Sequence, residues 1–163
     1  MPSSKRFGSA TVTFDDRFVP IIVVVWEGQT TLEAAKWGME QQQRVMSELT
    51  RRRERFILVS DASGAHRPSP EVRRFFATAS EEQPVELRRH ALSSYVVLSS
   101  GLMRGVMTAV GWLSEAARSV RSVATLREAL ERSLEDLDAA GVTRPEGLDP
   151  TSYDPSEVRA RTA

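Results

Sequence analysis

The chain has 163 residues, a length that suits one domain with a single buried core. Its 22 Lys and Arg residues balance 22 Asp and Glu residues, so no overall charge attracts nucleic acid or an anionic membrane. It has no cysteine, which excludes disulfides, iron–sulfur clusters and cysteine-ligated zinc.

The first part of the chain is polar. Residues 1–9 lack the apolar segment of a secretory signal, and we expect them to be flexible. The longest apolar run, Ile21–Trp26, is far shorter than the ~20 residues that a membrane-spanning helix needs. We therefore expect a cytoplasmic protein without a transmembrane segment.

Two short apolar segments then predict an antiparallel hairpin. Ala10–Phe14 alternates apolar with polar residues, and Asp15-Asp16-Arg17 supplies a turn before the second segment, Ile21–Trp26. A long helix follows, from Leu32 to about Glu54. Thr30, with Glu33 three residues later, has the spacing of a capping box at its start.

The segment around which the rest is organised is Arg55–Ser69. It begins as Phe-Ile-Leu-Val and passes into Ser, Asp, Gly and Pro, a pattern typical of a strand buried on both faces. We expect it in the middle of a parallel sheet. The residues after such a strand lie at the carboxyl edge of the sheet, where open α/β sheets usually bind their ligands.

Helices and strands continue to alternate after this segment. Ser69 is a predicted N-cap followed by Pro70 at the first helical position, and Pro84 ends that helix. The later expected elements are a short helical turn at Val85–His90, a strand at Ser94–Leu98, a helix at Leu102–Ala117, a strand at Ser119–Val123 and a helix at Leu126–Ala140. Residues 142–163 contain Pro145, Pro150 and Pro155 and few large apolar side chains, and indicate a polar tail.

The predicted fold class is therefore α/β. The order ββαβαβαβα indicates a single mixed, mostly parallel sheet with an opening antiparallel hairpin and about four helices, within a domain of residues 10–141.

Several local phrases resemble the STAS/SpoIIAA-like family. They are the strand ending in Asp (FILVSDASG), the serine-capped helix after a short loop, the strand YVVLSS and the closing VATLREALERSL, so that the resemblance spans Ala10 to Ala140. It implies a STAS/SpoIIAA-like fold and a protein that is typically not an enzyme. Members bind partner proteins, and some bind nucleotides or apolar ligands.

In the anti-anti-sigma branch of this family, a serine at the start of the second helix is phosphorylated within an Asp-Ser-Ser-Gly motif. The similar tetrapeptide here, Asp61-Ala62-Ser63-Gly64, occurs earlier, at the predicted strand end. Ser69 stands near the corresponding position, without that motif.

Catalytic alternatives are few. Asp61 could be a general base or a ligand carboxylate, or it could cap the turn after its strand through its own backbone. A hydrolase using Asp61, His66 and Ser69 would place its whole catalytic set in one flexible loop, which is poor pre-organisation. Two separated histidines with Asp61 are too few ligands for a metal. We expect neither catalysis nor a metal or cofactor, and no binding of nucleic acid.

The segment 101–117 is unusually apolar. On a helical wheel its large side chains cover well over half of the circumference, whereas one sheet face needs a stripe of about 100°. The surplus either packs in the core or contacts another chain or an apolar ligand. The members are Leu102, Met103, Val106, Met107, Ala109, Val110, Trp112 and Leu113.

The sequence therefore favours a non-catalytic protein-binding or regulatory module. Its expected working surface combines the loop Gly64–Ser69 with the helix Leu102–Leu113, and its partner could be a second copy in a homodimer. The partner-contacting residues are expected to be Ser63, His66, Ser69, Leu102, Met103, Val106, Met107, Val110 and Trp112. The alternative is a small carrier that binds an apolar ligand or a lipid beneath that helix.

Overall fold

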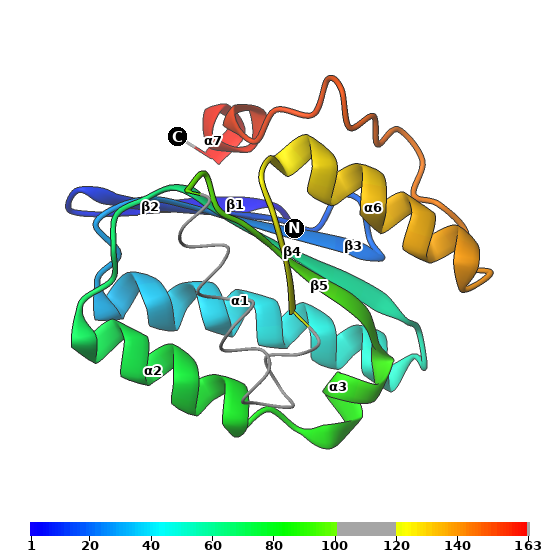
Figure 1. The fold of residues 1–163 in the computed structure, drawn as a ribbon, viewed down its shortest axis with the longest axis horizontal. Helices are drawn as coiled ribbons and strands as arrows, with labels where there is room; N and C mark the ends of the chain where they lie inside the picture. The colour runs from blue at the N-terminus through cyan, green and yellow to red at the C-terminus, as the bar shows by residue number, and fades with distance from the viewer. Residues whose placement is uncertain (101–119, 163) are drawn as a thin grey trace.

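The computed structural model describes residues 1–100 and 120–162, and in it a mixed sheet has helices on both faces (Figure 1). Within this part of the chain the sheet has six strands, and their spatial order follows the chain. The strands are β1 (Ser3–Phe7), β2 (Ala10–Asp15), β3 (Ile21–Gly28), β4 (Phe56–Ala65), β5 (Ala91–Val97) and β6 (Val120–Val123).

The described helices form two layers. One layer lies below the sheet in Figure 1 and holds α1 (Leu32–Arg51), α2 (Pro70–Glu81) and α3 (Val85–His90). The other lies above it and holds α6 (Leu126–Ala139) and α7 (Ser156–Thr162). Strands β1 to β3 pair antiparallel and strands β3 to β6 pair parallel. The predicted hairpin, the mostly parallel sheet and the α/β class are confirmed.

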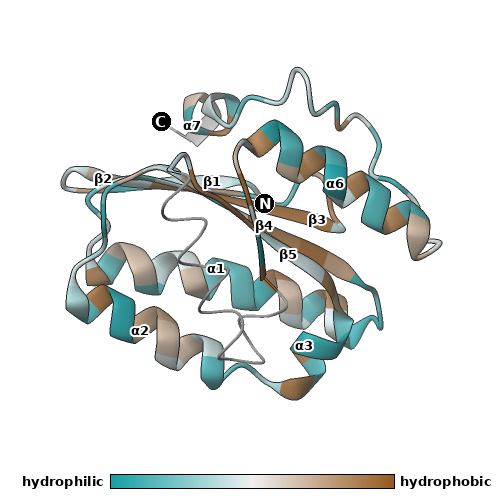
Figure 2. Ribbon diagram, in the orientation of Figure 1, coloured by the Kyte–Doolittle hydropathy of each residue, from teal (hydrophilic) through white to brown (hydrophobic). Residues whose placement is uncertain are grey.

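Alternation along the strands divides the core between the two layers. In β3, Ile22, Val24 and Trp26 face α1, while Ile21, Val23 and Val25 face α6. Both sets are buried, which explains why this segment is apolar at every position. Figure 2 shows the result: β3 is brown, while the outer faces of the helices are largely teal.

The approach of α1 to the sheet depends on Gly38. A Cβ atom built at this position would lie 2.3 Å from the indole of Trp26, so the helix rests on the ring at the one position that has no side chain. Trp26 also donates from its indole N–H to the hydroxyl of Ser60 at 3.0 Å, which fixes the ring. This contact sets the spacing between α1 and strands β3 and β4.

The helix starts largely follow the sequence prediction. The Ser69 hydroxyl accepts a hydrogen bond from the Val72 backbone N–H at 3.3 Å, and Pro70 is the first residue of α2, as predicted. For α1 the cap is Thr31, one residue later than predicted. Thr30 is buried at 5% exposure, whereas the Thr31 hydroxyl accepts from Ala34 at 3.1 Å.

Both ends of the chain are more ordered than the sequence suggests. Ser3–Phe7 is expected to be flexible but forms β1, because its backbone extends the sheet by pairing with Ala10–Phe14. The polar tail contains α7, whose Val158 is fully buried. Neither segment has the apolar periodicity from which a sequence predicts structure: β1 is an edge strand, and α7 has seven residues.

Candidate functional site

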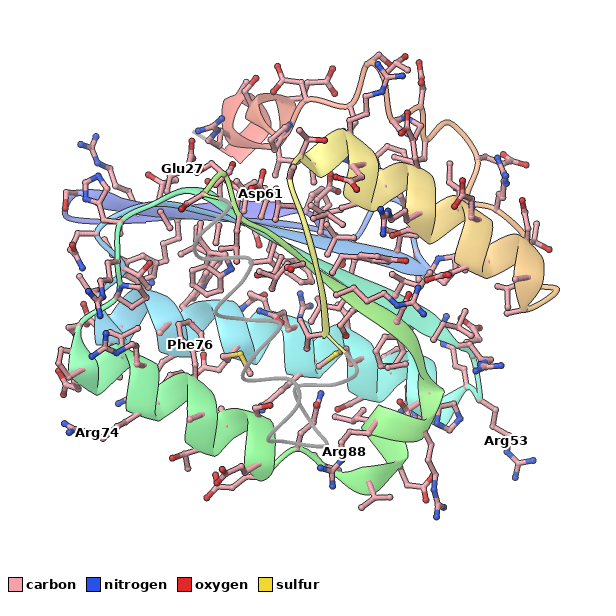
Figure 3. All side chains as sticks on the ribbon, in the orientation of Figure 1. Glu27, Arg53, Asp61, Arg74, Phe76 and Arg88 are labelled. Atoms are coloured by element: carbon pink, nitrogen blue, oxygen red, sulfur yellow. The ribbon has the colours of Figure 1, made fainter. Side chains whose placement is uncertain are left out.

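The carboxyl ends of β3 and β4 meet at one edge of the sheet. Val25 lies opposite Asp61, and Glu27 lies opposite Gly64, so β4 contains one extra residue between these pairs. This is a β-bulge, a feature that locally redirects side chains. Figure 3 shows Glu27 and Asp61 at the same end of the sheet, far from Arg53.

Asp61 lies within this bulge and is buried. Its side chain is 6% exposed, and one of its oxygens accepts a hydrogen bond from the Ser63 backbone N–H at 2.9 Å. This is the turn-capping role that the sequence left open as the alternative to catalysis. The strand itself continues to Ala65, four residues beyond the predicted end, because the bulge accommodates the small polar residues within the ladder.

The loop after β4 is tied to the turn after β3. The His66 backbone N–H donates to the Gly28 carbonyl at 2.9 Å, and the Gln29 side-chain amide donates to the Arg67 carbonyl at 3.3 Å. Gly28 has φ +70°, and a Cβ there would lie 2.1 Å from the Ser9 carbonyl oxygen, so the turn requires glycine. The loop backbone is therefore held to the β3 turn at His66 and Arg67.

Of the residues predicted here, Ser63 lies in the bulged end of β4, and His66 and Ser69 follow the strand. Ser63, His66 and Arg67 are exposed, and the Ser69 hydroxyl is used as the α2 N-cap. Among the described residues, the His66 ring makes no hydrogen bond to Ser63 or Ser69. In the same residues, no group of three or more His, Asp or Glu side chains is placed to hold a metal ion.

The other half of the predicted surface lies outside the described residues. This applies to the whole of the helix predicted at Leu102–Leu113. The residues concerned are Leu102, Met103, Val106, Met107, Val110 and Trp112.

A hollow of about 710 Å³ lies between the sheet and the layer of α1, α2 and α3. Its described lining is mostly apolar, with Ser60, Ser93 and Ser94 as polar members on the sheet side, and it is basic where α3 contributes Arg88 and Arg89. Apolar lining residues include Met39, Met46, Leu58, Phe76, Leu92 and Val96. A space with this lining suits an apolar group better than a polar one.

A polar cluster that the sequence did not indicate lies on the opposite face. Asp15, 1% exposed, accepts hydrogen bonds from the Arg17 guanidinium at 2.8 Å and from the Tyr153 phenol at 3.0 Å. Burial and the Asp15 carboxylate raise the pKa of Tyr153, and the hydrogen bond to Asp15 raises the pKa of Arg17. The sequence predicts only a turn at Asp15-Asp16-Arg17. The hydrogen bond from Tyr153 shows that Asp15 also anchors a segment near the end of the chain.

A second network joins β5, β6 and α6. The Tyr95 phenol donates to Asp136 at 2.6 Å, and Arg121 approaches both groups at 3.2–3.3 Å. Burial opposes ionisation of Asp136, but the nearby Ser93 hydroxyl, the hydrogen bond from Tyr95 and the Arg121 guanidinium bring its pKa below the usual value. Burial and the bond to Asp136 raise the pKa of Tyr95.

Searches of protein-family models and of curated proteins found no match for this chain. A search of solved structures found a DUF3478-family protein from Shewanella loihica PV-4, whose crystal structure is described as having a SpoIIAA-like fold. The two share 8% sequence identity with a TM-score of 0.54, over 82% of this chain and 92% of that one. The chain thus has a SpoIIAA-like fold, as its sequence suggested. None of the described helices is long and apolar enough to span a membrane.

Proposed function

We propose that this chain is a non-catalytic protein-binding or regulatory module that acts through the carboxyl edge of its sheet. The observation that carries the proposal is the anchored loop after β4. His66 and Arg67 are exposed, yet their backbone is fixed to Gly28 and Gln29. A loop already held in one conformation loses little entropy when it binds a partner.

The hydrogen bonds that the polar side chains at this edge make to nearby backbone support a binding function over a catalytic one. Asp61 and Ser69, two of the three residues that such a hydrolase would use, each accept a hydrogen bond from a nearby backbone N–H. In nucleophilic catalysis the nucleophile and its base lie within hydrogen-bond distance of each other. A third group commonly orients the base. The exposed set that remains, Ser63, His66 and Arg67, suits contact with another protein. The SpoIIAA-like fold, which is generally non-enzymatic, agrees with this.

The apolar segment Leu102–Leu113 lies outside the described residues, so its part in the proposed function is argued from the sequence alone. Its surplus of methionine and its tryptophan are residue types that are enriched at protein interfaces. We propose that it forms part of the surface that contacts a partner, including a second copy of this chain.

The carrier function is the second candidate, and the hollow of about 710 Å³ favours it. Solvent extraction of the natively purified protein followed by mass spectrometry tests it. A stoichiometric lipid or other apolar molecule would support the carrier in place of the binding module. The binding-module proposal predicts that no such molecule is found.

The binding module is tested by matched charge reversals at the two ends of β4. Arg67 follows the strand and Arg55 precedes it, and both are exposed. The strand between them has ten residues, which corresponds to about 30 Å. The tagged protein would be used to isolate partners from native lysate, with native mass spectrometry as the readout. Arg67→Glu should abolish the complex and Arg55→Glu should preserve it. Equal effects of both reversals would contradict the proposed surface.

A further inference from the structure

The segment 149–162, which we call the strap, folds back over one end of the sheet. It consists of a turn at Asp149–Tyr153 and of α7, which contacts β1 and β2. Tyr153 bonds Asp15 and packs edge-on against Phe18, with 5.9 Å between ring centroids. Figure 1 shows α7 on the same side of the sheet as α6, above β1 and β2.

The face that β2 presents to the strap is polar, whereas Tyr153 packs against the apolar core cluster that includes Ile21 and Val23. Alternation in β2 directs Ala10, Val12 and Phe14 into the core under α1, so that Thr11, Thr13 and Asp15 face the strap. The hydroxyls of Thr13 and Ser4 lie 3.1 Å apart and hydrogen-bond each other. The fully buried apolar side chain in α7 is Val158. Hydrophobic burial therefore holds α7 much less strongly than it holds α6, which has Leu130, Leu134 and Leu137 in the core.

Opening of the strap would leave no buried charge without a partner. Asp15 would lose the Tyr153 phenol but keep the hydrogen bonds from three donor groups of Arg17: its backbone N–H and Nε at 3.0 Å and its Nη2 at 2.8 Å. This matters because an uncompensated buried carboxylate would make opening very unfavourable.

The strap is also joined directly to the candidate binding surface. Arg159 of α7 forms an ion pair with Glu27 at 2.5 Å, and these side chains are 36% and 35% exposed. Glu27 lies opposite Gly64 in the ladder between β3 and β4, one residue from Ser63. At about one-third exposure both charges remain partly solvated, so breaking the link leaves neither of them fully buried.

We propose that the strap opens as a unit, without unfolding of the sheet, and that in its closed position it covers the Glu27 end of the binding surface. The covering role rests on the function proposed above. The opening itself does not. It is inferred from the polar face of β2, from the Arg17 bonds that Asp15 keeps, and from the partly solvated ion pairs that Arg159 and Glu157 of α7 form with Glu27 and Arg17. Segments with few buried apolar contacts commonly open locally at a free energy below that of global unfolding.

Hydrogen exchange of the full chain, followed by mass spectrometry, tests the proposal. Amides of the strap should exchange far faster than those of β3 and β4. Arg159→Ala should speed strap exchange about two- to fivefold, the range expected for an exposed ion pair. Arg144→Ala is the matched control, because Arg144 forms an exposed ion pair with Asp138 outside the strap. It should leave strap exchange unchanged.

Two outcomes would overturn the proposal: strap amides that exchange only as slowly as those of β3 and β4, or an Arg159→Ala variant whose strap exchanges no faster than that of Arg144→Ala. If Arg159→Ala fails to fold, Tyr153→Phe replaces it, since it removes the bond to Asp15 and keeps the ring against Phe18. The measurement needs no partner. A negative result therefore removes the strap mechanism alone, while failure of the proposed function would appear in the charge-reversal experiment.

Discussion

The phenol of Tyr153 donates a hydrogen bond at 3.0 Å to the buried carboxylate of Asp15, which lies 138 positions earlier in the chain. This bond attaches residues near the end of the chain to the turn of the opening hairpin. The turn residue Arg17 binds the same carboxylate, so one buried aspartate organises both the turn and the strap.

The two partners of Asp15 should contribute unequally to stability. Tyr153→Phe loses one hydrogen bond and should lower the free energy of unfolding by about 1 kcal/mol. Asp15→Asn removes the charge that faces Arg17 as well and should cost about 2–3 kcal/mol. Urea denaturation at neutral pH measures both. A Tyr153→Phe variant less stable than Asp15→Asn would show that Tyr153, rather than Arg17, is the main partner of this carboxylate.

Most of the fold was predictable because its strands and helices have strong local signals. The buried run in β4 and the Ser69-Pro70 helix start are both where the sequence places them. β1 and α7 were not predictable, since an edge strand with Lys and Arg has no apolar pattern and seven residues are too few to show helical periodicity.

The candidate site could be located from the sequence but not resolved in detail. The sequence placed it after β4, and the carboxyl ends of β3 and β4 do meet there. It left open whether Asp61 caps the turn after its strand, and the hydrogen bond from the Ser63 backbone N–H shows that it does. The contact of Arg159 with Glu27 joins residues 132 positions apart, and no local pattern indicates a pair so distant.

The Ser69 hydroxyl should stabilise α2 as its N-cap. Ser69→Ala should lower the free energy of unfolding by about 1 kcal/mol, because the Val72 N–H then loses its acceptor. Ser69→Asp keeps an acceptor and should retain most of that stability. Ser80→Ala, an exposed substitution late in the same helix, is the control and should have little effect.

Partner binding separates the cap from a regulatory role for the same serine. If Ser69 acts only as a cap, both variants should still bind the partner. Loss of binding in Ser69→Asp alone, with the fold intact, would instead make this serine a switch that phosphorylation could operate.

The network of Tyr95 and Asp136 should make stability depend on pH in acid. The pKa of folded Asp136 is lowered, so its contribution is present above the ordinary Asp value of about 3.9 and is lost as the pH falls through the folded value. Asp136→Asn should therefore cost about 1 kcal/mol at pH 7 and progressively less below about pH 4. Urea denaturation at both pH values measures this. A cost that does not change with pH would show that the charge of Asp136 does not contribute.

The same network should also make stability depend on pH in alkali, where its contribution falls as the pH rises. The pKa of folded Tyr95 is raised, so its contribution is complete below the ordinary tyrosine value of about 10 and is lost as the pH rises through the folded value. The stability difference between the wild type and Tyr95→Phe should narrow above pH 10. A difference that widens there would contradict this assignment.

The apolar segment that contains Met103 and Met107 should determine the assembly of the protein. If it contacts a partner or a second copy, Met103→Glu or Met107→Glu should abolish the complex, because a carboxylate cannot be desolvated in an apolar interface without a partner. Native mass spectrometry gives the assembly state, and circular dichroism checks that the fold is kept. An assembly unchanged by either substitution would show that this face is not an interface.

The central claim, that the edge after β4 contacts a partner protein, is most directly tested by cross-linking from that edge. Because the chain has no cysteine, a single Ser63→Cys carries a benzophenone label without background, and the exposed Ser47→Cys on α1 carries the same label as a control. Irradiation in native lysate and of the pure protein should yield a discrete heavier species from position 63 and none from position 47. No cross-linked species from position 63, or the same products from both positions, would contradict the account.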